Sequence, residues 1–192
     1  MDIAIVGATG NVGRKTLEVL EKKDLSIDNL YLLASSKSVG KKINFKGVDY
    51  EIHDLDSFDF SKVKICFFAA GGKISEKFAE KAAKNCLVID NSSYFRMDPE
   101  VPLIVPQVNS EDLKNIKKNI IANPNCTTII SLMGIKPLLN IQKIKRVVAT
   151  SFQSVSGAGN NGMDELLTNT KRFFSNKKSL NVVFDKNITF NT

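Results

Sequence analysis

Short apolar runs alternate with amphipathic stretches from the start of the chain to residue 122. The runs are rich in β-branched and aromatic residues and predict strands at residues 3–6, 30–34, 64–69, 87–90, 103–105 and 120–122. The stretches between them predict helices that begin at Asn11, with Val12, Thr16 and Leu20 on one face, and at Lys73, with Ile74, Phe78 and Ala82 on one face. Strands that are bounded by helices and apolar on both faces are typical of a mostly parallel sheet covered by helices, so we expect an α/β fold.

The pattern changes after residue 126. A helix that is apolar nearly all round, at 127–139, is followed by a predicted strand at 146–153, a helix at 161–174 and a strand-like run at 187–192. The last run has no partner strands left in the sequence to complete a sheet. We therefore predict a first domain over residues 1–127 and an incomplete α+β domain over residues 128–192.

Composition narrows the functional classes. With 192 residues, of which 43% are hydrophobic, the chain can bury a sizeable core. No apolar stretch approaches the roughly 20 residues needed to cross a bilayer, and the start lacks the basic opening of a secretory signal, so we expect a cytoplasmic protein without a membrane partner. The net charge of +7 comes from scattered lysines without interleaved aromatic residues, which favours anionic small molecules over nucleic acid as partners.

Three glycines mark the turn after the first predicted strand. Gly7, Gly10 and Gly13 are spaced Gly-x-x-Gly-x-x-Gly and open the first predicted helix. Glycines let the backbone approach a pyrophosphate closely, and the helix N-terminus offers N–H groups and a positive dipole to its charge. At this junction the motif predicts a Rossmann-like dinucleotide-binding domain; the alternative is a tight turn needed only for packing.

The residues that follow the second strand indicate which dinucleotide binds. An NAD enzyme usually places an Asp or Glu there to hold the ribose hydroxyls, whereas this strand ends in Ser35-Ser36-Lys37-Ser38. Hydroxyls and a cation suit a 2′-phosphate and favour NADP over NAD, the alternative being an ordinary polar turn. Ala70 and Gly71 follow a later buried strand and extend the predicted cofactor site along the same sheet edge.

The three cysteines are odd in number and widely spaced, which predicts neither a disulfide framework nor a metal site. Cys126 differs from the other two, because it follows Pro124 and Asn125, a good N-cap, and is the first residue of a predicted helix. A thiol at the positive end of a helix dipole tends to be nucleophilic, whereas Cys66 and Cys86 lie in or beside apolar strands and should be inert.

A nucleophilic thiol beside a nicotinamide indicates a particular chemistry. The thiolate adds to an aldehyde, hydride leaves to NADP+, and the resulting thioester is attacked by a second nucleophile such as phosphate; the reverse path reduces an acyl phosphate. That route needs a proton acceptor near the sulfur. The one histidine, His53, lies in a predicted short strand far in sequence from both sites, and we assign it to surface structure.

Several segments together resemble the amino-terminal part of aspartate-semialdehyde dehydrogenase. They are the glycine turn at 7–13, Leu-Ala-Ser-Ser-Lys-Ser at 33–38, Asp-Asn-Ser-Ser-Tyr-Phe-Arg-Met-Asp at 90–98, the stretch at 101–109, Asn-Pro-Asn-Cys-Thr-Thr at 123–128 and Gln-Ser-Val-Ser-Gly-Ala-Gly at 153–159. The resemblance implies a homodimeric enzyme of lysine, methionine and threonine biosynthesis. It would reduce 4-aspartyl phosphate to L-aspartate 4-semialdehyde and release phosphate.

The resemblance also implies a role for each matching residue. Cys126 would be the nucleophile and Gln153 would orient the substrate, with Arg96 and Asn125 holding the phosphate group. Thr9, Gly10, Asn11 and Val12 would contact the cofactor pyrophosphate, Lys37 and Ser38 the 2′-phosphate, and Ser156 and Gly157 the nicotinamide region.

Other interpretations stay open at this point. The family's catalytic histidine and its carboxylate-binding arginine should lie beyond Thr192, so we expect the chain to be truncated and nearly inactive alone. Two alternatives to the dehydrogenase are N-acetyl-glutamyl-phosphate reductase, whose relatives differ around the cysteine, and a non-catalytic NADP-binding module.

Overall fold

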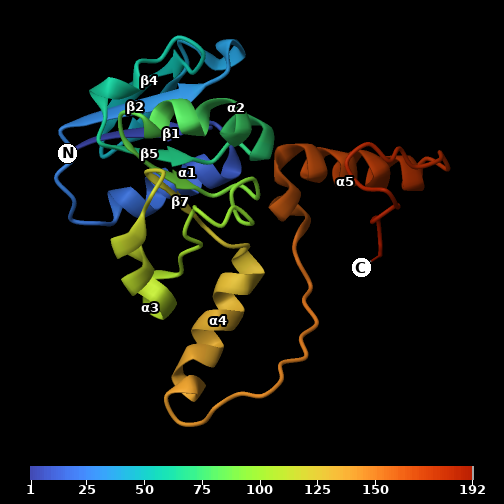
Figure 1. Ribbon diagram of the computed structural model, residues 1–192. Coiled ribbons are helices and arrows are strands. Elements are labelled where there is room, and N and C mark those ends of the chain that lie inside the picture. The colour runs from blue at the N-terminus through green and yellow to red at the C-terminus, as the bar shows by residue number, and fades with distance from the viewer. Residues whose placement is uncertain (192) are drawn as a thin grey trace. The chain divides into compact units, whose positions relative to one another are not determined.

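A computed structural model describes residues 1–191 (Figure 1). By contacts it divides into two units, one over Met1–Lys145 and one from Arg146 onward. The strands are β1 (Asp2–Val6), β2 (Asn29–Ala34), β3 (Lys42–Phe45), β4 (Val48–Asp54), β5 (Ile65–Phe68), β6 (Leu87–Asp90) and β7 (Ile120–Ala122). The helices are α1 (Asn11–Glu21), α2 (Gly72–Ala83), α3 (Pro106–Asn109), α4 (Cys126–Leu139) and α5 (Gly159–Phe174), with short 3₁₀ turns η1 (Ser36–Ser38), η2 (Phe60–Lys62), η3 (Ser110–Asn115) and η4 (Val155–Ala158).

The first unit is built on one seven-stranded sheet in the order β3-β4-β2-β1-β5-β6-β7. Every pairing is parallel except that of β3 with β4, which is antiparallel. The predicted α/β fold with a mostly parallel sheet is confirmed. After β1 the chain builds first towards β2 and β4, then returns to the other side of β1 for β5, β6 and β7. The carboxyl ends of β1 and β5 therefore flank a topological switch point, where folds of this kind bind their ligands.

The central strand β1 is buried on both faces. Its successive side chains point to opposite sides of the sheet, and each side is covered by a helix. On one side Ala4 and Val6 pack in a cluster with Phe78 of α2, and on the other Ile3 and Ile5 pack in a cluster with residues of α1. The two helices thus hold β1 from opposite faces, which fixes the positions at which the loops after β1 and β5 emerge.

The face that α1 buries differs from the prediction. Gly13, Leu17 and Leu20 are its buried residues, whereas Val12 is 50% exposed. Leu20 is buried as predicted, but Thr16 is only half-buried and Val12 is exposed, because Gly13, which has no side chain to show in a hydrophobicity pattern, lies directly against the loop after β1.

Three predicted strands are also wrong. Residues 103–105 form only an isolated bridge from Leu103 to Ala122, because Pro102 and Pro106 on either side lack an N–H group to donate. The segment 146–153 has no regular structure, and neither do residues 187–191, Thr192 being outside the described residues. A strand forms only with a partner to hydrogen-bond, and among residues 146–191 neither segment has one.

The second unit is organised around α5. Within residues 146–191 the regular elements are η4 and α5. Residues 180–184, which form no helix or strand, are tied to α5 by the Asn169 amide, which donates to the Leu180 carbonyl at 2.8 Å, and by the Glu165 carboxylate, which accepts from the Val182 N–H at 2.8 Å. No helix among the described residues combines the length and apolar character that a bilayer span requires.

Candidate functional site

The glycine loop after β1 fits tightly between the ends of two neighbouring strands. Gly7 has φ +82°, and a Cβ there would lie 2.8 Å from the Ala69 carbonyl oxygen, just after β5. The Gly7 and Ala8 N–H groups donate to the Leu33 carbonyl in β2 at 2.8 and 3.2 Å. The structure therefore brings the predicted cofactor residues Gly7 and Ala70 side by side at the switch point.

The same loop presses closely on the helix that follows. A Cβ at Gly13 would lie 2.2 Å from the Gly7 carbonyl oxygen, so no larger residue fits without moving backbone. Gly10 is the N-cap of α1 with an extended backbone, and Asn11 and Val12 begin the helix. The first N–H groups of a helix have no acceptor inside it, and the dipole places positive charge there. Together with Thr9, this cradle suits the pyrophosphate of a dinucleotide.

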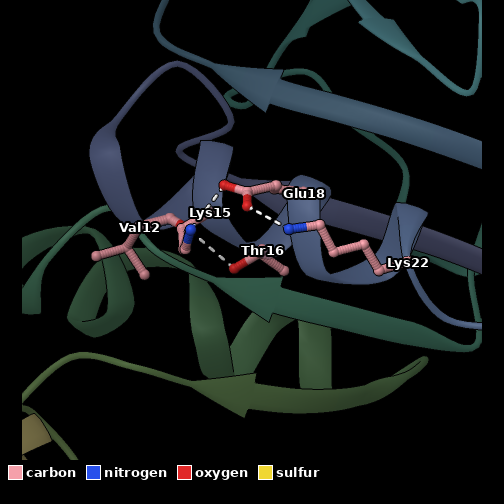
Figure 2. Close-up of polar contacts among 5 residues, drawn as sticks. All are labelled: Val12, Lys15, Thr16, Glu18 and Lys22. Carbon is pink, nitrogen blue, oxygen red and sulfur yellow. Dashed lines mark hydrogen bonds and ion pairs between the residues drawn. The ribbon is translucent and has the colours of Figure 1, made fainter.

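The outer face of α1 carries a chain of polar contacts (Figure 2). Lys15 and Lys22 donate to the two oxygens of Glu18 at 2.7 and 2.8 Å, and the Thr16 hydroxyl donates to the Val12 carbonyl at 2.9 Å. The hydrogen bond from Lys15, together with that from Lys22, lowers the pKa of the Glu18 carboxyl to about 2. Glu18 is therefore charged at neutral pH, so these lysines are engaged along the exposed face of the helix.

The turn after β2 lies at the same sheet edge. Ser35 holds the N-cap position of η1, which consists of Ser36, Lys37 and Ser38. Lys37 is exposed and Ser38 half-buried. The side chains proposed for the 2′-phosphate thus follow directly on a strand that is hydrogen-bonded to β1.

Cys126 occupies the first position of α4, as the sequence predicted. Asn125 is the N-cap, and its Oδ1 accepts from the Thr127 N–H at 3.0 Å and from the Thr127 hydroxyl. Cys126 is exposed, and its Sγ lies 3.8 Å from the same Oδ1. Cys66 and Cys86 are both buried, and burial raises the pKa of the Cys66 thiol well above its usual range. Of the three thiols, Cys126 is the accessible one.

Arg96 is held at the ends of the two strands nearest to Cys126. Its Nε donates to the Asn123 carbonyl at 3.0 Å and its Nη2 to the Asn91 carbonyl at 3.3 Å. Asn91 follows β6, and Asn123 lies between β7 and α4. A guanidinium carries five N–H groups in a planar fork, so these two bonds leave Nη1 to bind an anion. Arg96 and Asn125 are therefore brought to the same end of the sheet.

Sequence reasoning missed Asn91 and Asn123 themselves. The Asn123 side-chain amide donates to the Asn91 Oδ1 at 2.7 Å, and the Asn91 amide donates to the Phe68 carbonyl at 3.2 Å. These bonds tie together the carboxyl ends of β5, β6 and β7. A signal was present, because each asparagine stands directly after a predicted strand, where a polar side chain meets the other strand ends.

A cavity of about 550 Å³ opens beside this network. Asn91 and Asn123 line it, together with Val12 and Thr16 of α1 and apolar residues of the strands, among them Ile89. The cavity thus joins the start of α1 to the strand ends that hold Arg96.

The remaining predicted residues lie in the second unit. Gln153, Ser156 and Gly157 are exposed. Gln153 precedes η4, and Ser156 and Gly157 belong to it; the Ser154 side chain caps this turn by accepting from the Ser156 N–H. A Cβ at Gly157 would lie 2.1 Å from Gln153 Nε2, so the two residues are in direct contact. No group of three His, Cys, Asp or Glu side chains able to hold a metal ion occurs within residues 1–191.

Comparisons with known proteins match both units. The family model "Semialdehyde dehydrogenase, NAD binding domain" matches residues 2–116, and "Semialdehyde dehydrogenase, dimerisation domain" matches residues 135–192. An aspartate-semialdehyde dehydrogenase of Rickettsia bellii is 49% identical over 99% of this chain and 57% of the relative. The chain therefore spans about 57% of the length of that curated relative.

Solved structures give the same result. A structure of aspartate semialdehyde dehydrogenase II from Vibrio cholerae, complexed with ASA, superposes with a TM-score of 0.92 at 43% identity, over 99% of this chain and 57% of that one. A structure of aspartate semialdehyde dehydrogenase with NADP from Candida albicans matches with a TM-score of 0.60 at 26% identity, over 73% of this chain and 47% of that one. The resemblance predicted from the motifs is confirmed, and the chain belongs to the semialdehyde dehydrogenase family.

Proposed function

We propose that this chain forms the cofactor-binding and thiol-bearing part of an NADP-dependent aspartate-semialdehyde dehydrogenase. The reaction is the reduction of 4-aspartyl phosphate to L-aspartate 4-semialdehyde with release of phosphate, on the route to lysine, methionine and threonine. The proposal includes a cytoplasmic homodimer. We also propose the domain boundary predicted from the sequence, between a first domain over residues 1–127 and a second over residues 128–192.

The cofactor would be held by the loops of the switch point. Thr9, Gly10, Asn11 and Val12 would contact the pyrophosphate through the start of α1, next to Ala70 and Gly71. Lys37 and Ser38 would contact the 2′-phosphate, and Ser156 with Gly157 the nicotinamide region. When bound, NADPH supplies the hydride that reduces the acyl group.

The protein's own residues would carry the covalent step. The Cys126 thiolate attacks the acyl carbon of 4-aspartyl phosphate, the bond from carbon to the phosphate oxygen breaks, and phosphate leaves with the electron pair. Arg96 and Asn125 bind the departing phosphate, and Gln153 orients the thioester. After hydride addition at the acyl carbon the carbon–sulfur bond breaks, which releases the aldehyde and restores the thiolate.

One observation carries this proposal. Cys126 is exposed at the first position of a capped helix, and Arg96 donates to the carbonyl of Asn123 on the segment that leads into that helix. A nucleophile and a guanidinium at the end of the same strand match the needs of an acyl phosphate, because its carbon must meet the sulfur while its phosphate meets a cation.

Alkylation of the thiols tests the nucleophile on this chain alone. With iodoacetamide near neutral pH, we expect Cys126 to be modified much faster than Cys66 or Cys86, as followed by mass spectrometry of peptides. Equal, slow modification of all three would favour the non-catalytic module instead.

Activity tests the reaction itself. The assay is phosphate-dependent NADP+ reduction with aspartate semialdehyde, for this chain alone and for a chimera continued after Thr192 with the rest of the Rickettsia bellii relative. We expect turnover by the chimera only, and a loss of at least about 10³-fold in its Cys126→Ser variant. Cys86→Ser is the matched control, because a serine hydroxyl can replace the Cys86 thiol that donates to the Ala82 carbonyl. A chimera without activity would contradict the proposed reaction.

A further inference from the structure

Asp90 is a fully buried carboxylate at the end of β6, and the proposed chemistry does not use it. Its Oδ1 accepts from the Ser75 hydroxyl at 2.7 Å and from the Ser92 N–H at 3.1 Å, and its Oδ2 accepts from the Ser92 hydroxyl at 2.7 Å. A buried carboxylate is costly unless its lone pairs are satisfied. The donors around Asp90 are therefore held in one arrangement.

Ser92 links the fixed Asp90 carboxylate to the loop that follows β6. Its hydroxyl oxygen accepts from the Tyr94 N–H at 3.1 Å. The next residue, Phe95, is 2% exposed and packs in the same core cluster as the strands. Arg96 comes directly after it. The carboxylate thus shapes the tight turn that delivers Arg96 to the carbonyls of the two asparagines.

Ser75 connects the same carboxylate to a different element. It lies in the first turn of α2, fully buried, and its N–H donates to the Gly71 carbonyl at 3.2 Å. This bond fixes the start of α2, which is a different segment from the loop that carries Arg96. The two serines therefore offer hydroxyls at the same 2.7 Å distance from Asp90, but only one of them belongs to the loop that carries the arginine.

We propose that Asp90 is a positioning residue for phosphate binding, which acts through Ser92 to place the Arg96 guanidinium. The inference rests on the proposed function, in which Arg96 holds the phosphate group. Asp90 itself touches neither substrate nor cofactor in this scheme. Its role is to set the turn geometry, because a guanidinium fork must meet phosphate oxygens in a defined orientation.

Titration of this chain with inorganic phosphate tests the proposal, with NADP+ present and NMR following the backbone amides and the Arg96 Nε–H signal. We expect Ser92→Ala and Asp90→Asn to raise the phosphate Kd by about tenfold, the factor that corresponds to 1.4 kcal/mol. Ser75→Ala removes an equivalent hydroxyl from the same carboxylate and should change the Kd by less than about twofold. Its unfolding temperature should nevertheless fall, because the buried carboxylate loses a donor, so a lower unfolding temperature with an unchanged Kd distinguishes a loss of stability from a loss of positioning.

Two results would overturn the inference while leaving Arg96 as the phosphate ligand. One is a Kd in Ser92→Ala equal to that of the unaltered chain, and the other is an equal rise in Ser75→Ala. Arg96→Ala tests separately the proposed role of Arg96 as the phosphate ligand, on which the inference rests. If Arg96→Ala binds phosphate as well as the unaltered chain does, the proposed role of Arg96 fails, and the inference fails with it.

Discussion

Exchanging Gly13 for alanine should measure how closely the cofactor loop is fitted to its helix. The added Cβ would lie 2.2 Å from the Gly7 carbonyl oxygen and 2.8 Å from the Ala8 Cα. Both neighbours are backbone atoms, so the contact cannot be relieved by rotating a side chain. Reaching an ordinary separation of more than 3 Å requires the loop to move by roughly 1 Å, and overpacking of this kind costs about 3 kcal/mol at the upper end of its usual range.

Alanine also favours the helix over glycine by about 1 kcal/mol, so the net loss for Gly13→Ala is about 2 kcal/mol. Gly134 provides a matched control, because it lies inside α4 and a Cβ there would meet nothing within 4 Å. Gly134→Ala should therefore stabilise the chain by up to about 1 kcal/mol.

Thermal unfolding followed by circular dichroism gives the comparison. For a chain of this length we expect a midpoint roughly 4–8 °C lower for Gly13→Ala and roughly 2–4 °C higher for Gly134→Ala. Fluorescence titration should show weaker NADP binding in Gly13→Ala alone, because only there does the pyrophosphate cradle move. A Gly13→Ala chain as stable as Gly134→Ala, with unaltered cofactor affinity, would refute the argument from close approach.

Three further predictions concern other parts of the chain. Lys37→Ala should weaken NADP+ binding by about tenfold and leave NAD+ binding unchanged, as measured by fluorescence titration; an equal loss for both would show that the lysine does not read the 2′-phosphate. Asn125→Ala removes the N-cap of α4 and should lower the free energy of unfolding by about 1 kcal/mol in urea, whereas Asn125→Asp keeps an acceptor oxygen and should cost less. Glu165 accepts from the N–H groups of residues 182–184, above all Val183, and these bonds lower the pKa of its carboxyl. Its contribution to stability is therefore present above the unfolded pKa near 4.5 and is lost as the pH falls through the lower folded pKa. The protection of these amides against hydrogen exchange, relative to the intrinsic rate at each pH, should fall only in acid.

Much of the first unit could be predicted because its signals are local. The run from Ile3 to Val6 followed by the glycine turn specifies strand, loop and helix within a few residues, and the cap at Asn125 lies next to the thiol it positions. The short strand that holds His53 was predicted and is part of β4, but its hairpin with β3 was overlooked, although the turn Lys46-Gly47 contains a glycine. Both turn residues have positive φ, 50° and 80°. A two-residue turn with Gly between alternating apolar positions is a local signal for a hairpin.

The failures came from interactions that are distant in sequence. Residues 146–153 have the composition of a strand, but a ladder also needs a neighbour, and residue pattern does not say whether one is present. The anchoring of Arg96 was hidden for a related reason, because its acceptors are carbonyl groups that every residue possesses. Which carbonyl lies within reach depends on the strand order, and that order emerges only when β6 and β7 pair.

The hydrogen bonds that hold Arg96 to main-chain carbonyls have an evolutionary consequence. Main-chain oxygens survive almost any replacement of the side chains attached to them, so the side chains of Asn91 and Asn123 can change while the arginine keeps the same two contacts. Deep mutational scanning should accordingly find intolerance at Arg96 and a milder response at the two asparagines. At these two positions Arg96 depends on the main chain and not on the side chain.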